Sequence, residues 1–197
     1  IILLAAAQIV KAERVVTGNK DLDPRFAGGT IRGDLVLTGT KLTSDNLAID
    51  LRGLAARLAL RGDIATGGYA VAGPVTARGF VLPDLGLVDA DAKILASIGA
   101  GSPWKLAVNA AGRMRRIDNA TLASLTGGNI RFSGGVNLAQ NAPILFRDAR
   151  LDANKLSLRV SGRRLASGQT TFAGSGCHAH HAPFTIGAAG GADGLRA

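Results

Sequence analysis

The residue types best suited to binding a metal ion lie close together near the end of the sequence. Cys177, His178, His180 and His181 include every cysteine and histidine of the chain. Thiolate and imidazole groups are ligands of zinc and copper, and His178 and His180 would point to the same side of a strand. No second group of such residues is present to complete a tetrahedral shell. We therefore expect a polar strand or loop here and no metal site; Cys177, His178 and His180 are the candidate ligands should one exist.

Sequence signatures of catalysis are absent elsewhere. The chain contains no GxxxxGK[ST], GxGxxG or GxSxG segment, so neither a phosphate-binding loop nor a nucleophile on a tight turn is indicated. Asp89 and Asp91 would share one face of a strand, but no histidine lies within sequence reach to form an acid–base pair with either. We expect no enzymatic activity and no cofactor.

The elements that must position these residues follow from a strict alternation of apolar and polar residues. In 54–64, for example, Leu58 and Leu60 fall on one face and Arg57 and Arg61 on the other. Such alternation over five to ten residues is typical of a sheet with one apolar and one polar face. Since parallel strands are normally apolar on both faces, the sheet should be antiparallel. The sequence predicts an all-β fold.

Glycine pairs and asparagines set the expected strand boundaries, because they allow the positive φ angles of hairpin turns and bulges. Pro74 lies within a strand-like run and indicates an edge strand or a bulge there. Short matches such as 31–35 with 60–64 indicate repeated units. We expect strands at 8–17, 30–40, 46–52, 54–65, 68–81, 84–95, 103–116, 129–139, 143–153, 155–163, 168–175 and 183–192.

One segment predicts a helix instead. Asp118 and Asn119 can cap a helix start, Leu122 and Leu125 stand at helical spacing, and a glycine pair follows. We expect a short helix near 119–126 that plugs one end of the sheet. The chain is interpreted as one repetitive domain over 1–197, with a subdivision into 1–117 and 118–197 at this helix as the alternative.

A single short helix is too small to cover about a dozen strands, so the apolar face needs another way to avoid water. Hydrophobic residues make up 47% of the chain but aromatic residues only 4%, which gives a smooth aliphatic surface. Curling the sheet would leave an elongated, taco-like apolar groove that acyl chains can fill, with a gain of about 0.8 kcal/mol per buried methylene. The expected lining residues are Leu35, Leu37, Leu58, Leu60, Leu106, Val108, Phe132, Val136, Leu156, Leu158 and Val160.

The formal net charge of +9 predicts attraction to an anionic partner, either nucleic acid or phospholipid headgroups. Proteins that bind nucleic acid without sequence preference combine a basic groove with stacking aromatic rings. Here single Arg and Lys residues are spread over the polar positions, and aromatic residues are few. We therefore expect lipid and no nucleic acid.

The sequence resembles the periplasmic AsmA-like proteins, most closely their YdbH and TamB branches. The resemblance is carried by about the last 80 residues, where LASLTGG leads into NIRFSGGV and glycine-punctuated strands follow. The strands in question are LFRDARLDANKLSLRVSGR, TTFAGSG and HAPFTIGAAGGADG. The segments GTIRGDLVLTG and LRGDIATGGYAVAGPVTARGF are similar in texture only.

The resemblance implies a strongly curved β-groove that spans the periplasm and carries phospholipids between the inner and outer membranes without catalytic residues. It also implies an inner-membrane anchor, which we expect in a segment outside this fragment, and an outer-membrane partner protein. The opening IILLAAAQIV is too short for a membrane helix and is interpreted as a buried strand or a clipped element. The Cys177 cluster matches no motif of that family.

Other functions remain open at this stage. Some members of the family assist the assembly of outer-membrane proteins. An outer-membrane β-barrel would show the same alternation, but it would carry aromatic girdles, which are not apparent here. A structural β-repeat of an adhesin would require a more regular spacing than this chain has, and an enzyme lacks support in the motifs.

Overall fold

In the computed structural model, which describes residues 29–99, 102–179, 181–191 and 194–196, the chain forms one antiparallel sheet of 13 strands and one short helix. The strand expected at 8–17 lies outside the described residues. The strands are β1 (Thr30–Arg32), β2 (Val36–Thr38), β3 (Lys41–Leu51), β4 (Leu54–Asp63), β5 (Gly68–Leu82), β6 (Gly86–Gly99), β7 (Ser102–Ile117), β8 (Arg131–Ala139), β9 (Ile144–Asp152), β10 (Leu156–Arg164), β11 (Thr170–His178), β12 (Phe184–Gly191) and β13 (Gly194–Arg196).

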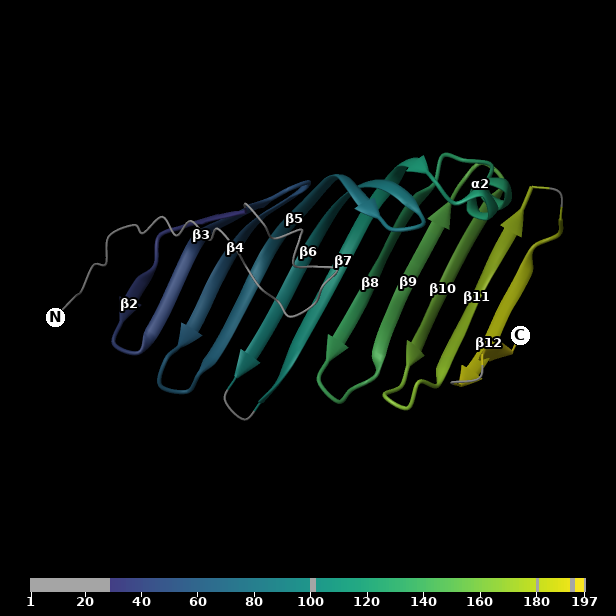
Figure 1. Ribbon diagram of the computed structural model, residues 1–197. Coiled ribbons are helices and arrows are strands. Elements are labelled where there is room, and N and C mark those ends of the chain that lie inside the picture. Colours follow the sequence, from purple (N-terminus) through teal and green to yellow (C-terminus); the bar gives the residue numbers. More distant parts are fainter. Residues whose placement is uncertain (1–28, 100–101, 180, 192–193, 197) are drawn as a thin grey trace.

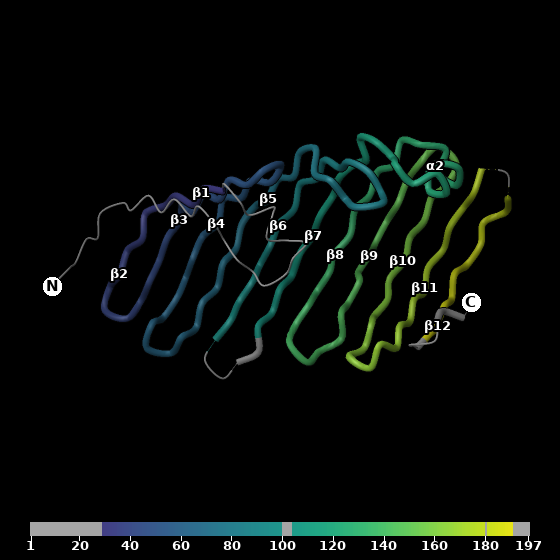
Figure 2. The backbone as a smooth tube through the Cα atoms, in the orientation of Figure 1, coloured from purple at the N-terminus to yellow at the C-terminus, as the bar shows by residue number. Residues whose placement is uncertain are grey.

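From β3 to β13 the strands pair in the order in which they follow one another in the chain. Figure 1 shows them side by side, from purple at one end of the sheet to yellow at the other. Within the described residues the first and last strands of this order do not pair with each other, so the sheet is long, curved and open (Figures 1 and 2). The expected all-β, curved antiparallel groove is confirmed.

The strand expected at 30–40 is divided in two. β1 and β2 both pair with β3, and they are separated by a bend at 33–35. At this bend the backbone hydrogen bonds to β3 are interrupted, and the Asn46 side chain supplies bonds in their place. Its side-chain oxygen accepts a hydrogen bond from the Asp34 backbone N–H at 2.8 Å. Its side-chain nitrogen donates to the Asp34 carboxylate at 2.6 Å. The side chain of one strand therefore completes the broken edge of the other.

The expectation of an edge strand or a bulge at Pro74 is wrong. It sits in β5, between β4 and β6, and the register with both neighbours runs past it without a shift. The pairing of β5 with β4 is assigned at Ala56–Val75 and again at Ala59–Ala72 but not at the two positions between. A proline lacks the N–H that a ladder needs. The sheet thus accommodates Pro74 by a local gap in one ladder and not by an edge or a bulge.

The register shifts at several points along the sheet, and charged residues accompany the shifts. Breaks occur in the pairing of β3 with β4, β5 with β6, β6 with β7, and β9 with both of its neighbours. An extra residue in one strand bends that strand and increases the local twist, so these breaks help to curve the sheet. Three of them carry ion pairs: Asp45 with Arg61, Asp91 with Arg78, and Asp148 with Arg159.

The helix α2 (Ala120–Thr126) lies at one end of the strands (Figure 1), as the sequence predicts. Asn119 caps it by accepting a hydrogen bond from the Leu122 N–H at 2.8 Å, and Gly127 ends it with φ of 67°. Thr126 and Ile130 are fully buried here, and the Lys155 N–H donates to the Thr126 carbonyl at 2.8 Å. The helix therefore closes a small core and ties β7 to the turn between β9 and β10.

Candidate functional site: an apolar face and a polar basin on opposite sides of the sheet

The pairing register assigns each side chain to one side of the sheet, because directly opposed residues of neighbouring strands project to the same face. Following these partners from β3 to β11 gives continuous rows of apolar residues. One row contains Leu47, Leu58, Gly73, Ile94, Val108, Val136, Phe146, Gly162 and Phe172. We call the side that carries these rows the apolar face, and the opposite side the polar face.

The register places all but one of the predicted lining residues on the apolar face. These are Leu37, Leu58, Leu60, Leu106, Val108, Phe132, Val136, Leu156, Leu158 and Val160. Leu35 is different, because it lies in the bend between β1 and β2 and is 38% exposed. The alternation of apolar and polar residues continues through 33–35, although the chain is not paired with a neighbouring strand there.

Much of the apolar face is open to solvent within the described part of the chain. Leu58 is buried at 5% exposure, but most side chains in its row are only partly covered. Near the β6–β7 turn, Tyr69, Ile98 and Trp104 surround a hollow of about 300 Å³, and Ile98 is 57% exposed. Among the described residues, α2 contacts the end of β7, and no other helix lies over the sheet.

Two aromatic residues that the sequence analysis did not single out add to this face. The rings of Phe146 and Phe172 meet with their centroids 5.7 Å apart, although their strands are separated by β10. Gly162 of β10 lies directly between them in the row and has no side chain to keep them apart. The glycine is therefore what allows the two rings to meet on the apolar face.

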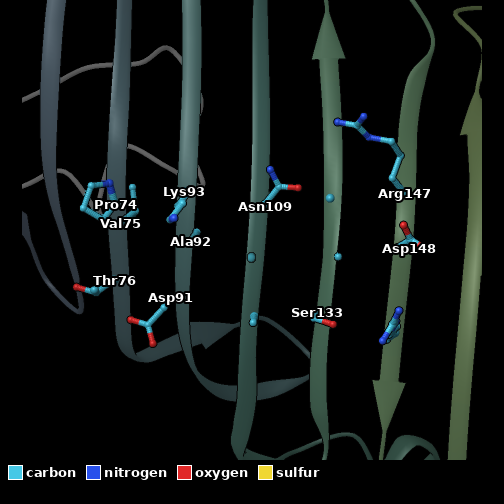
Figure 3. A pocket seen from close by; sticks show the side chains of 15 residues that line it. Pro74, Val75, Thr76, Asp91, Ala92, Lys93, Asn109, Ser133, Arg147 and Asp148 are labelled. Atoms are coloured by element: carbon cyan, nitrogen blue, oxygen red, sulfur yellow. The ribbon is translucent and has the colours of Figure 1, made fainter.

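A further hollow lies on the other side of the sheet. It has a volume of about 760 Å³ and extends from β5 to β9 (Figure 3). We call it the polar basin. Its floor is low because the residues there are small, and Gly135 is buried. Polar and charged side chains surround this floor: Thr76, Asp91, Lys93, Asn109, Ser133, Arg147, Asp148 and Arg150.

A β-bulge at Asp148 builds one wall of the basin. Asp148 has φ of 46°, and the pairing of β9 with both neighbours shifts by one residue at this position. Arg147 and Arg150 are three residues apart and would face opposite sides of a regular strand. Because of the bulge, Arg147 pairs with Gly135 and Arg150 with Ser133, both on the polar face.

The bulge concentrates positive charge around one carboxylate. Arg159 donates a hydrogen bond to Asp148 at 2.8 Å, and the Asp148 N–H donates to the Ser161 hydroxyl at 3.1 Å. This hydrogen bond from Arg159, with the charges of Arg159, Arg150 and Arg147, lowers the pKa of Asp148 below its ordinary value. Asp148 is thus held ionised, and the arginines around it outnumber it.

The Cys177 cluster does not converge on one site in the described residues. Cys177 pairs with Ser157 and faces the polar side, whereas His178 pairs with Leu156 and faces the apolar side. The Nδ1 atoms of His178 and His181 lie 3.3 Å apart, and His180 is outside the described residues. Among the residues that the structure describes, no group of three or more His, Cys, Asp or Glu side chains is arranged to hold a metal ion.

No protein-family model, curated protein or solved structure matches this chain. A search of the described residues for a helix with the length and apolarity to cross a membrane finds none. Functional inference therefore rests on the two faces of the sheet.

Proposed function

We propose that this chain is a non-enzymatic carrier of phospholipid, which holds the acyl chains against its apolar face. The observation that supports this most directly is the continuity of that face, since apolar rows run unbroken across neighbouring strands without a second layer over them in the described residues. Contiguous exposed apolar surface of this extent marks a site of interaction with lipid or protein. A sheet that is polar on its other side presents only one surface to such a partner.

The dimensions of the face suit acyl chains. The apolar rows cross the nine neighbouring strands from β3 to β11, and strands are about 4.8 Å apart, so the rows extend for roughly 40 Å. One leaflet of a bilayer's hydrocarbon core is about 15 Å thick. The face is therefore long enough for several lipids in succession, which favours a path along the sheet over a single binding pocket.

The chemistry of the lining also supports lipids of varied tail length. Leucine, valine and alanine dominate the rows, and each buried methylene gains about 0.8 kcal/mol wherever it lies along them. Across β6, β7 and β8, the described residues of these rows carry no polar side chain that would fix one tail in one position. Acyl chains can accordingly move from strand to strand with little change in free energy.

The cellular setting belongs to the same proposal. We propose a periplasmic setting, between the inner and outer membranes, because the resemblance of 118–197 to the AsmA-like proteins implies it. An inner-membrane anchor and a separate outer-membrane partner protein are part of the same proposal. The family's alternative activity, assistance to the assembly of outer-membrane proteins, would place an unfolded β-strand on the apolar face in place of lipid.

The test is to purify the protein in mild detergent and identify bound lipids by mass spectrometry. Phospholipid should copurify at a fixed ratio, and Val108→Arg or Val160→Arg should remove it, because either change places a charge within the apolar rows. Leu95→Arg is the matched control. Leu95 lies on the polar face and is 55% exposed, so its replacement should leave the lipid ratio unchanged.

Far-ultraviolet circular dichroism establishes that each variant keeps its sheet. Recovery of no phospholipid from the folded wild-type protein would contradict the proposal and favour outer-membrane protein assembly. Equal loss of lipid in Leu95→Arg and Val160→Arg would show that binding does not depend on the apolar face.

A further inference from the structure

We propose that the polar basin binds a small, water-soluble anion through its phosphate groups. This site is separate from the apolar face, since the two lie on opposite sides of the same sheet. Four features of the polar face favour such a ligand: the hollow, the cations around it that have no ion-pair partner, the bulge that gathers them and the hydrogen-bond donors on its floor.

The cations of the basin keep hydrogen-bond donors that their surroundings do not use. Lys93 and Arg150 make no hydrogen bond or ion pair within the described residues. Arg147 donates one hydrogen bond, to the Asn137 side-chain oxygen at 3.0 Å, and a guanidinium has five N–H groups to donate. Three positive side chains thus keep donors available for a ligand.

The two carboxylates of the basin are already engaged. Asp91 is paired with Arg78 at 2.6 Å, and Asp148 with Arg159 at 2.8 Å. Neither Arg78 nor Arg159 lines the basin, so both carboxylates are neutralised from outside it. The charge left for a ligand is therefore that of Lys93, Arg147 and Arg150.

The three cations lie on two sides of the basin, and side chains on the floor between them can also donate hydrogen bonds. Lys93, Asn109, Gly135 and Arg147 are directly opposed across β6 to β9, so Lys93 and Arg147 are about 14 Å apart at their Cα atoms. Between them lie the amide of Asn109 and, one row away, the hydroxyl of Ser133, which is Arg150's cross-strand partner. Figure 3 shows Arg147 extending from β9 toward β8, with Asn109 on the next strand beyond.

Phosphate is the anion that this arrangement fits best. A phosphate monoester carries about −1.5 to −2 charges at neutral pH and has three strong acceptor oxygens, whereas a carboxylate has one charge and two oxygens. Arginine pairs with phosphate through two parallel hydrogen bonds, and two arginines on one wall offer two such forks. The separation of Lys93 from the arginines favours a ligand with more than one phosphate.

The basin's construction indicates a site and not an accident of surface charge. Bulges occur preferentially where a strand must redirect a side chain. Without the bulge at Asp148, either Arg147 or Arg150 would project onto the apolar face. At Gly135 a side chain would also be in the way, since a Cβ there would stand 2.7 Å from the Asn109 side-chain oxygen.

The experiment is titration calorimetry with pyrophosphate as the probe, at low ionic strength. We expect one binding site per chain. Lys93→Gln, Arg147→Gln and Arg150→Gln should each weaken the association by about tenfold, because a hydrogen bond to a charged group contributes roughly that factor. These side chains are exposed, so the variants should fold normally.

Lys105→Gln and Arg163→Gln are the matched controls. Both residues are exposed cations of the polar face outside the basin, and both replacements remove one charge. The controls should alter the affinity by less than about twofold, as screening reduces the effect of distant charges. If the controls and the basin variants weakened pyrophosphate binding equally, the binding would reflect only a general attraction between the anion and a positively charged surface, and the proposal would be overturned.

Two further measurements separate this inference from its alternatives. Vesicles that contain phosphatidylglycerol test whether the phosphate belongs to a membrane surface. Sedimentation with such vesicles that depends on Arg150, without binding of pyrophosphate, would overturn the proposal of a soluble ligand. Val160→Arg should leave pyrophosphate binding unchanged, so loss of lipid carriage and loss of anion binding are distinguishable.

Discussion

Replacing Gly162 by alanine should destabilise the protein, because the aromatic contact on the apolar face depends on the missing side chain. A Cβ at this position would stand 2.3 Å from Cδ1 of Phe172 and 2.4 Å from the carbonyl oxygen of Thr171. Both distances are too short for real contacts. The ring and the backbone of β11 must therefore move, and the Phe146–Phe172 contact at 5.7 Å is lost or distorted.

The magnitude follows from three contributions. Overpacking of a close contact costs about 1–3 kcal/mol, and an aromatic pair contributes about 0.5–1.5 kcal/mol. Against these, alanine is favoured over glycine inside a strand by roughly 0.5–1 kcal/mol. The variant should therefore lose about 0.5–4 kcal/mol of unfolding free energy, which urea denaturation followed by circular dichroism can measure.

Gly187→Ala provides the matched control. Gly187 also lies in a strand, but no atom stands within 4 Å of the position that its Cβ would occupy. Its replacement should be neutral or stabilising by up to about 1 kcal/mol. If the two variants were equally stable, the glycine between the two rings would not be needed for their contact, and the reasoning would be refuted.

Two more predictions concern local charge and capping. The pKa of the Asp148 carboxyl, measured by NMR, should lie below 3.8. Its ion pair with Arg159 is therefore present at higher pH and is lost as the pH falls through the lowered pKa. Arg159→Gln should raise this pKa, and an unchanged pKa would contradict the pairing. Asn119→Ala should cost about 0.5–2 kcal/mol in urea denaturation, because the Leu122 N–H loses its acceptor. Asn119→Asp retains an acceptor and should be close to wild type; similar losses in both variants would argue against the cap.

The alternation of residues was enough to predict most of the sheet. Where apolar residues recur at every second position, as at Leu156, Leu158 and Val160, the strand and its apolar face are as expected. The helix was predictable as well, since Asn119 and Gly127 mark its ends by local chemistry that needs no tertiary contact.

The bulges were missed, although they leave a trace in the sequence. In β9, the apolar positions are even at Ile144 and Phe146 and odd at Ala149 and Leu151. That change of phase places an extra residue between them, at Asp148. Treating 143–153 as one regular strand hid the bulge, and with it the common face of the two arginines.

The polar basin could not be predicted from any single segment. Its residues come from five strands and meet only through the register between those strands. A register depends on turn lengths and bulges that the alternation does not specify. For the same reason, the proximity of His178 to His181 in space, and the separation of Cys177 onto the other face, emerged only from the pairing of β10 with β11.

Pairing in chain order has a consequence for how the molecule forms and how it can change in length. Each strand after β3 finds its partner one turn away, or beyond the short helix, so contact order is low and little loop entropy opposes each step. Hairpins can accordingly join the growing edge one after another during synthesis. Gain or loss of a hairpin in the gene would lengthen or shorten the sheet by about 10 Å, the width of two strands, while the remaining strands keep their neighbours.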